Sequence, residues 1–350
     1  MMAPRRGGPR SGATGARPRP SRRTIRARRT ALAAVVGTAA IAVVVLLVGA
    51  GASPGSATPG VSAASTSRSS SSTSTTRTTQ RSSTHAKHVP LVLVTPVAAP
   101  VSSWTVVARV RGQPAAWLEN AAGVTLIRFD QRYVHLTLHA GSIDGGATGW
   151  QYGDQITPAE IHRVVAAFNG GFKLTYSGVG FVSGGRVAVA LSSGLASIVT
   201  YTDGTTGVGA WNEGVPTRRK TVFSVLQNQR LLIDRGVAAP TVTNCIITCW
   251  GATIGGLTTV ARSALGVRAD GQLLWAAGEQ LTPATLASAM IGAGAVRAVE
   301  LDINPDWVDG YLYVHHATGP VAVPVVAGQL GISGQFLLPY SRDFFAIVAN

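Results

Sequence analysis

Short segments in which hydrophobic and polar residues alternate recur along the second half of the chain and predict a domain built mainly of β-strands. In YVHLTLH at 133–139 every second residue is hydrophobic, which is the pattern of a half-buried strand. We expect His135 and His139 on its other face to be solvated or hydrogen bonded rather than metal ligands, because no acidic or Cys partner is evident. Further strand-like segments are RVAVAL, TVFSVL and YLYVHH.

Two Asp-Gly pairs mark β-hairpins, because this dipeptide favours the tight turns that join antiparallel strands. Asp203-Gly204 separates ASIVTY from TGVGAW, and Asp270-Gly271 separates ALGVRA from QLLWAA. The sequence therefore predicts at least two local strand pairs.

Two segments have the start signals of helices. Thr157 is followed by Pro158 and Glu160, which together form an N-cap, a first-turn proline and a capping box. A second helix is expected to begin at Thr282-Pro283 and to end near the glycines at 292 and 294. With no regular βαβ alternation, the fold class is α+β: a β-rich, mixed-sheet globular domain with a few helices.

The N-terminal part of the chain predicts membrane insertion. Residues 1–30 contain ten Arg and no acid, and no residue from 31 to 48 is charged. We interpret 1–30 as a basic cytoplasmic tail and 31–50 as one transmembrane helix, which would place the rest of the chain outside the membrane. A signal sequence cleaved after Ala50-Gly51-Ala52, giving a secreted protein, is the alternative.

The segment that follows is rich in Ser and Thr and has almost nothing to bury. We therefore expect 51–95 to be a disordered linker and 96–350 to be one extracytoplasmic domain. The net charge of +15 belongs to the tails, because residues from 91 onward contain 16 basic and 15 acidic side chains. This near-neutral balance excludes a nucleic-acid-binding domain.

The chain contains two cysteines, Cys245 and Cys249. Outside the cell a disulfide between them is expected. A metal site would need more ligands close by.

The segment AVELDI at 298–303 carries two carboxylates in an otherwise hydrophobic strand. Glu300 and Asp302 lie on the same face, about 6.6–6.8 Å apart along a strand. Such a pair suits general acid/base chemistry with a water between the two groups, and a solvent-facing acidic edge is the alternative.

The segment AAFNGGF at 166–172 is either a tight turn or a ligand-binding loop. Glycine at 170 and 171 would let the backbone turn and approach a ligand closely. Asn169 offers a donor and an acceptor for sugar hydroxyls or phosphate oxygens. A simple hairpin turn remains the other interpretation, because Asn-Gly is a strong hairpin signal.

These segments together resemble the phosphodiester glycosidase family, over roughly residues 120–348. AAFNGGF, then RSALGVRADGQLLWAAG, then LTPATLASAMIGAGAVRAVELD follow the order of that family's three motifs. The resemblance implies hydrolysis of sugar-1-phosphodiester linkages, here in the cell envelope. The matching positions are Asn169, Gly170, Gly171, Phe172, Arg262, Gly266, Leu301 and Asp302.

The resemblance assigns roles to individual residues. Asp302 is expected to be the base or charge stabiliser, with Glu300 tuning it or taking over its role. Arg262 is expected to hold the phosphate through its planar fork, with a structural salt bridge as the alternative. Lys173, Asp306 and Trp307 are additional candidates near the site. No cofactor is expected, although binding of a divalent cation by the carboxylates is not excluded.

The third motif departs from the family. Where the family has Gly-Gly-Gly-Ser, this chain has Ile303-Asn304-Pro305-Asp306, and proline lacks the N–H that could bind an anion. A non-catalytic domain that binds envelope glycans or phosphoglycans is therefore a second hypothesis. A structural envelope domain is a third.

Overall fold

The computed structural model describes residues 103–146 and 149–350, which fall within one compact unit, Val94–Asn350. The predicted tail, transmembrane segment and linker lie outside the described residues. Within the described ranges, no helix is long and hydrophobic enough to cross a membrane.

The described strands form three sheets, and every pairing between these strands is antiparallel. The expected β-rich domain with few helices is confirmed, whereas the expected mixing of strand directions is wrong for these strand pairs. Hairpins connect many of the neighbouring strands, and a hairpin produces an antiparallel pair.

The eight-stranded sheet has the order β1-β2-β3-β14-β13-β15-β11-β12. Its strands are β1 (Thr105–Val110), β2 (Gln113–Ala121), β3 (Val124–Phe129), β11 (Leu231–Asp234), β12 (Val237–Ala238), β13 (Val260–Arg268), β14 (Leu273–Leu281) and β15 (Ala295–Glu300).

Two five-stranded sheets complete the β structure, with the orders β7-β6-β10-β8-β9 and β17-β16-β5-β18-β4. The first contains β6 (Phe181–Ser183), β7 (Arg186–Val189), β8 (Ala196–Tyr201), β9 (Thr206–Ala210) and β10 (Val222–Gln227). The second contains β4 (Val134–His139), β5 (Val164–Asn169), β16 (Gly310–His316), β17 (Gly319–Pro324) and β18 (Phe344–Ala349).

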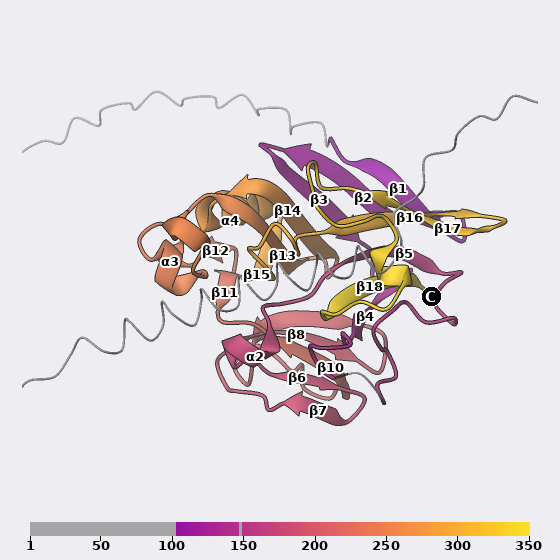
Figure 1. Cartoon of the computed structure of the whole chain (residues 1–350), viewed down its shortest axis with the longest axis horizontal. Helices are drawn as coiled ribbons and strands as arrows, with labels where there is room; N and C mark the ends of the chain where they lie inside the picture. The colour runs from indigo at the N-terminus through magenta and orange to yellow at the C-terminus, as the bar shows by residue number, and fades with distance from the viewer. Residues whose placement is uncertain (1–102, 147–148) are drawn as a thin grey trace, which may run out of the picture. The chain divides into compact units, whose positions relative to one another are not determined.

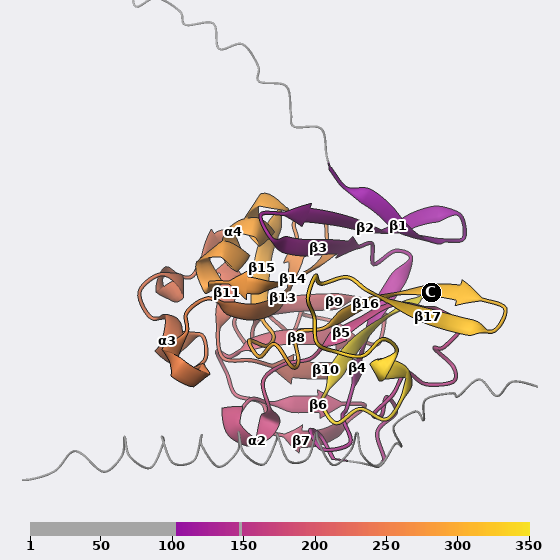
Figure 2. The ribbon, with the colours of Figure 1, turned by 45° about the horizontal axis from the view of Figure 1, so that its top comes forward.

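Short helices connect the strands. They are α2 (Leu174–Ser177), α3 (Ile246–Cys249), α4 (Pro283–Gly292) and the 3₁₀ turns η1 (Pro240–Val242), η2 (Ile254–Gly256) and η3 (Gln335–Leu337). Helix α4 covers one face of the eight-stranded sheet (Figure 1), where Leu286 and Met290 pack against Leu274 and Ala298. The other face of that sheet meets both five-stranded sheets (Figure 2) in one core that includes Trp275, Phe168 and Leu226.

Both predicted hairpins are confirmed. Gly204 and Gly271 adopt positive φ angles of 83° and 81° in the turns that join β8 to β9 and β13 to β14. The helix expected at Thr282-Pro283 is also confirmed: α4 follows Thr282, which caps it and forms a capping box with Thr285.

The helix expected at Thr157 is absent, and the described backbone there forms turns. The capping interactions do form, since Glu160 Oε2 accepts hydrogen bonds from Thr157 N at 2.9 Å and Thr157 Oγ1 at 2.6 Å. Strand β5 begins immediately afterwards at Val164, and this strand lies between β16 and β18. The central strand therefore begins before a helix can form.

Strand β4 is more deeply buried than a half-buried strand. His139 is fully buried, stacks on Phe344 with ring centroids 4.4 Å apart, and lies 3.4 Å from Glu160 Oε1. Thr137 donates a hydrogen bond to the same carboxylate oxygen at 2.8 Å. Thr137 and His139 on the polar face of β4 are thus hydrogen bonded inside the protein, whereas His135 is partly exposed.

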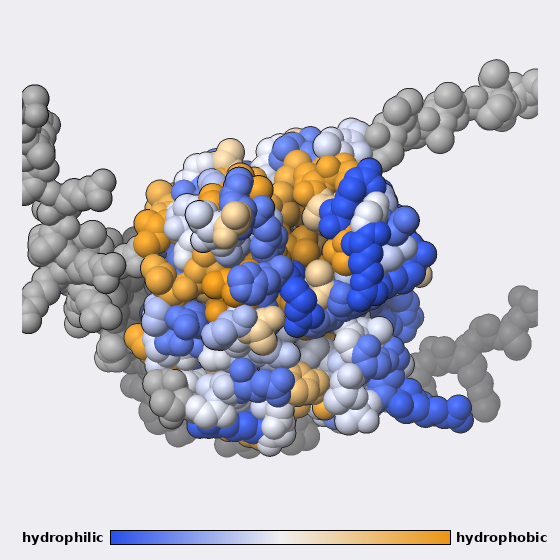
Figure 3. Space-filling view, turned by 90° about the vertical axis from the view of Figure 1, so that its right-hand side faces the viewer, coloured by the Kyte–Doolittle hydropathy of each residue, from blue (hydrophilic) through white to orange (hydrophobic). Residues whose placement is uncertain are grey.

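The β16–β17 hairpin extends to the right in Figure 1 and carries exposed hydrophobic residues. Val314 pairs with Val321 across the hairpin, and both are about half exposed, at 47% and 50%. Figure 3 views the molecule from this side and shows hydrophobic side chains beside strongly polar ones.

Glu160 should make the folded state sensitive to acid. Burial raises its pKa, but hydrogen bonds from His139 and Thr157 outweigh burial and lower it from 4.5 to about 2. A carboxyl whose pKa is lowered by folding stabilises the fold above its unfolded pKa and loses this effect as pH falls toward its folded pKa. We therefore expect the free energy of unfolding to fall by on the order of 1–3 kcal/mol between about pH 4.5 and 2 through this group.

The measurement is urea denaturation across this pH range for the wild-type protein and Glu160→Gln. The variant should lose the Glu160 contribution at neutral pH and show a flatter pH dependence. Glu213→Gln, at an exposed carboxylate, is the matched control. Parallel curves for the wild type and Glu160→Gln would contradict the assignment.

Candidate functional site

The Asn-Gly-Gly-Phe segment leaves the end of a central strand. Strand β5 is buried along its whole length and ends at Asn169. Its two partners, β16 and β18, come from far along the chain, so Asn169-Gly170 is not a hairpin turn. The chain instead continues through Phe172 into the short helix α2.

Gly170 is required for close approach and not for a positive φ angle. A Cβ atom at this position would collide with the carboxylate of Asp343. The Asp343 backbone carbonyl accepts Gly170 N at 3.1 Å, and Asp343 Oδ2 accepts Gly171 N at 2.9 Å. Burial raises the pKa of Asp343 to about 7, against the opposing effect of Arg342. The backbone N–H groups of Gly170 and Gly171 therefore hold the loop against Asp343, just before β18, and a side chain at Gly170 would prevent this.

Asn169 and Asp302, two of the residues predicted from the sequence, meet at Ser263. Asn169 Nδ2 donates to Ser263 Oγ at 2.9 Å, and the backbone N–H of Asp302 lies 3.4 Å from the same oxygen. All three residues are buried. The first and third sequence motifs are thus joined through a hydroxyl of the second.

The carboxylate of Asp302 is fully engaged by the protein. Oδ1 accepts hydrogen bonds from Ile303 N at 2.7 Å and Asn304 N at 3.0 Å, while Oδ2 lies 3.2 Å from Arg342 Nη2. Burial raises the pKa of Asp302, with Arg342 opposing the shift. The backbone donors of this loop point at its own carboxylate, and Pro305 supplies none.

Arg342 connects several loops around Asp302. Its Nη2 also donates to the carbonyl of Gly171 at 2.7 Å, and its Nε lies 2.5 Å from Asp144 Oδ2. The indole of Trp307 packs against the guanidinium at 5.0 Å. A single buried arginine therefore holds the Asp302 loop and the Gly170–Gly171 loop together.

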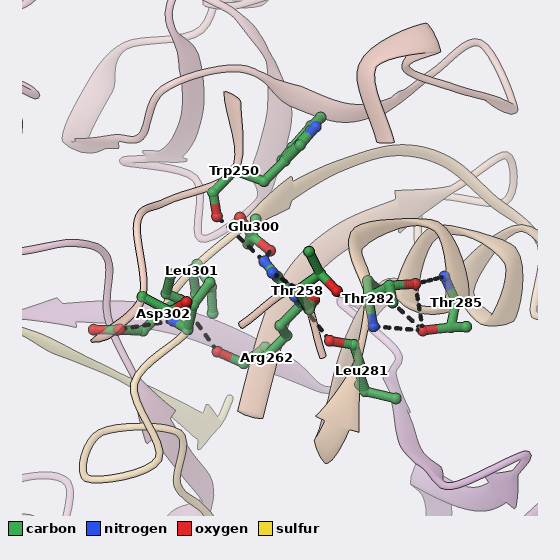
Figure 4. A network of polar contacts seen from close by, with 12 residues as sticks. Trp250, Thr258, Arg262, Leu281, Thr282, Thr285, Glu300, Leu301 and Asp302 are labelled. Carbon is green, nitrogen blue, oxygen red and sulfur yellow. Dashed lines mark hydrogen bonds and ion pairs between the residues drawn. The ribbon is translucent and has the colours of Figure 1, made fainter. Parts of the chain in front are cut away.

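Whereas Arg342 pairs with Asp302, the side chain of Arg262 pairs with Glu300 (Figure 4). Its guanidinium is fully buried, and Nη1 donates to Glu300 Oε1 at 2.7 Å and to the Trp250 carbonyl at 3.2 Å. Nε donates to the Leu281 carbonyl at 3.0 Å and Nη2 to the Thr258 carbonyl at 3.3 Å. This position does not match the expected role as a phosphate clamp, because protein oxygens occupy the fork and solvent does not reach it.

Glu300 retains one uncommitted oxygen. Its Oε2 has no hydrogen-bond partner among the described residues, and neither has Oδ1 of Asn228. Asn228 Nδ2 donates to the carbonyl of Leu301 at 2.9 Å, which fixes Asn228 beside the end of β15. Burial raises the pKa of Glu300 to about 7, against the opposing effect of Arg262.

A small cavity lies at Glu300. Its volume of about 10 Å³ is close to the space that one water molecule needs. The residues that line it include Phe172, Asn228, Gln229, Arg230, Trp250 and Glu300. Aromatic rings, amides, a cation and a carboxylate thus surround one small space.

The remaining sequence candidates occupy different surroundings. Lys173 and Asp306 are exposed, whereas Trp307 is partly buried against Arg342 and Tyr340. Cys245 and Cys249 are joined by a disulfide, and Cys249 also lines the small cavity. Within residues 103–146 and 149–350, no group of three or more His, Cys, Asp or Glu is placed to hold a metal ion.

Several residues that build the site were missed by sequence reasoning. They are Asp144, Asn228, Arg230, Ser263, Arg342 and Asp343. For two of them the sequence contained a signal. Arg342 and Asp343 directly precede the hydrophobic strand FFAIVA, so they lie at one end of a strand, as Asn169 does. Asn228 and Arg230 lie in an ordinary polar loop between two strands and carry no such signal.

The comparisons with known proteins give distant structural similarities. No family model and no curated protein matches the sequence. The catalytic domain of zebrafish N-acetylglucosamine-1-phosphodiester alpha-N-acetylglucosaminidase, auto-inhibited by pro-peptide, matches with a TM-score of 0.42 and 14% identity, over 67% of this chain and 78% of that chain.

Two further solved structures match at similar levels. A hypothetical protein from Synechocystis has a TM-score of 0.37 and 13% identity, over 69% of this chain and 63% of that chain. An exported protein from Burkholderia pseudomallei has a TM-score of 0.36 and 11% identity, over 67% of this chain and 75% of that chain. All three TM-scores lie below 0.5, so the role of the site is argued from its own geometry.

Gly170→Ala should strongly destabilise the protein, because the new methyl group would displace the Asp343 carboxylate. We expect a loss of at least about 1–3 kcal/mol in the free energy of unfolding, measured by chemical denaturation. Gly292→Ala is the matched control, since a Cβ atom there meets nothing within 4 Å. Equal stability of the two variants would show that the loop does not need this close approach.

Proposed function

We propose that this domain hydrolyses sugar-1-phosphodiester linkages, with Glu300 as its general base. The observation that carries the proposal is the state of Glu300 at the small cavity. One carboxylate oxygen is held by Arg262 at 2.7 Å, and the other has no partner among the described residues. A buried carboxyl with a pKa of about 7 is suited to accept a proton near neutral pH.

The chemistry requires a base but not a strong acid. Glu300 accepts a proton from a water molecule while the water oxygen forms a bond to C1 of the sugar. The C1–O bond to phosphate breaks, and its electron pair leaves with the phosphate monoester. Because this leaving group is a stabilised anion, it does not need the protonation that ordinary glycosidases provide.

The size of the cavity fits a site that holds the attacking water inside it and the sugar outside it. About 10 Å³ accommodates one water and no sugar ring, so the sugar binds at the mouth of the cavity and the water inside it. Asn228 Oδ1 and Glu300 Oε2 are two acceptors for the hydrogens of one water. On this proposal Asp302 has a different role: with both oxygens engaged, it supports the loop and supplies fixed negative charge near the reacting carbon.

A domain that binds phosphoglycans without cleaving them is the second candidate. The inward-facing amides of Ile303 and Asn304 favour it, because this loop then has no backbone donors to stabilise the charge that develops on the departing phosphate during cleavage. The two proposals differ in one measurable respect, which is the release of free sugar.

The pH profile of hydrolysis tests the role of Glu300. As a base it must be deprotonated, so kcat/KM should fall about tenfold for each pH unit below about 7 and reach a plateau above it. Glu300→Gln should reduce kcat by about 10²–10⁴-fold. The assay is sugar release from a panel of sugar-1-phosphate methyl esters by the full-length protein.

Glu279→Gln is the matched control, since Glu279 is also a partly buried carboxyl whose pKa burial raises. It should leave both the rate and the profile unchanged. Cleavage by Glu300→Gln at the wild-type rate would exclude Glu300 as the base. Binding of the esters without sugar release by the wild type would favour the second candidate.

A further inference from the structure

We propose that Arg230 forms the anion subsite of this domain and holds the phosphate of the ligand in place of Arg262. This inference rests on the proposed function, because the phosphate is that of the sugar-1-phosphodiester. It assigns a binding role to a residue outside the three motifs that resemble the glycosidase family.

Another cation is needed because both buried arginines are already paired with carboxylates. Arg262 is committed to Glu300 and to three backbone carbonyls. Arg342 is committed to Asp144 and Asp302 and is itself buried. A phosphodiester that approached either guanidinium would have to displace a buried carboxylate, which would leave that carboxylate without its partner.

Arg230 differs from both arginines in exposure and in partners. It is exposed, and no described residue forms a hydrogen bond or an ion pair with it. It also lines the same cavity as Glu300. Its planar fork is therefore available to phosphate oxygens, for which a bidentate contact is the favoured geometry.

The loop that carries Arg230 is anchored to the end of β15. Asn228 N donates to the Ala196 carbonyl at 2.8 Å, and Asn228 Nδ2 donates to the Leu301 carbonyl at 2.9 Å. Arg230 follows two residues later, immediately before β11, which itself pairs with β15. The backbone next to Arg230 is thus fixed relative to Glu300, so the cation and the base act on one ligand.

The arrangement also indicates how the ligand is oriented. With phosphate on Arg230 and water at Glu300, C1 of the sugar lies between the two groups at the cavity mouth. Phe172 lines the same cavity and is partly exposed, so its ring is available to a sugar face. The subsite selects anionic esters, and a neutral glycoside of the same sugar gains nothing from it.

The experiment compares Arg230→Ala, Arg230→Lys and the control Arg218→Ala in the full-length protein. Arg218 is also an exposed arginine and does not line the cavity. The readouts are KM and kcat for sugar-1-phosphate methyl esters and inhibition by inorganic phosphate. A 4-nitrophenyl glycoside of the cleaved sugar serves as the neutral probe.

Arg230→Ala should raise KM for the phosphodiester by about 10- to 100-fold and weaken phosphate inhibition by a similar factor, because a charge-assisted hydrogen-bonded contact is lost. The kcat should change little, and the neutral probe should be unaffected. Arg230→Lys should recover part of the loss, since it keeps the charge without the fork. Arg218→Ala should match the wild type.

The outcomes separate the subsite from the proposed function. If the wild type cleaves the esters and Arg230→Ala behaves like Arg218→Ala, the subsite assignment is overturned and the hydrolase remains. If the wild type binds phosphate, loses it in Arg230→Ala and releases no sugar, the subsite is supported and the hydrolase is overturned. An absence of both phosphate binding and cleavage in the wild type overturns both.

Discussion

The buried ion pair between Arg262 and Glu300 is the interaction on which the site depends. It joins neighbouring strands β13 and β15 and reaches the Trp250 carbonyl and the end of β14 through the same guanidinium. Removing one partner from such a pair costs about 3–5 kcal/mol, because the other charge is left buried without compensation. The pair therefore fixes the direction of the Glu300 side chain and determines which of its oxygens is left for other chemistry.

The second ion pair, between Arg342 and Asp302, explains why two carboxylates so close in sequence differ in chemical character. Strand β15 ends at Glu300, and the chain turns so that Asp302 bonds to its own loop and to Arg342. Asp302 is surrounded by donors on both oxygens, whereas Glu300 has a donor on one. Burial raises the pKa of each group, but only Glu300 combines a pKa near neutrality with an uncommitted oxygen beside a cavity.

Local rules predicted those parts of the fold that local interactions determine. The Asp-Gly hairpins and the helix that begins after Thr282 form because their turn and cap geometry is specified within a few residues. The Thr-Pro start signal at Thr157 did not produce a helix, because tertiary packing of β5 between β16 and β18 begins at Val164. Nothing in the sequence near Thr157 encodes the two partner strands, which come from the C-terminal part of the chain.

For the candidate site, the sequence predicted where some residues lie in the strands but not which partners their side chains contact. The sequence placed Asn169 and Glu300 at strand ends correctly, whereas Asp302, expected on the same strand face as Glu300, lies in the loop after β15. The pairing of each acid with a particular arginine depends on contacts between distant residues. Arg262 was expected to face a ligand because it resembles a motif residue. Its side chain instead lies on the same face of β13 as Ala264, and α4 covers this face. A charge buried there needs a buried partner, which is Glu300.

The replacement of a glycine-rich segment by Ile303-Asn304-Pro305-Asp306 has a physical consequence for where an anion can bind. In a glycine-rich loop the backbone amides are available to a ligand. Here the amides of Ile303 and Asn304 are used by the Asp302 carboxylate, and Pro305 has no N–H. On the proposed function, anion recognition is therefore assigned to a side chain that lines the cavity at Glu300. The β10–β11 loop, which Asn228 ties to the end of β15, carries an exposed arginine at that position.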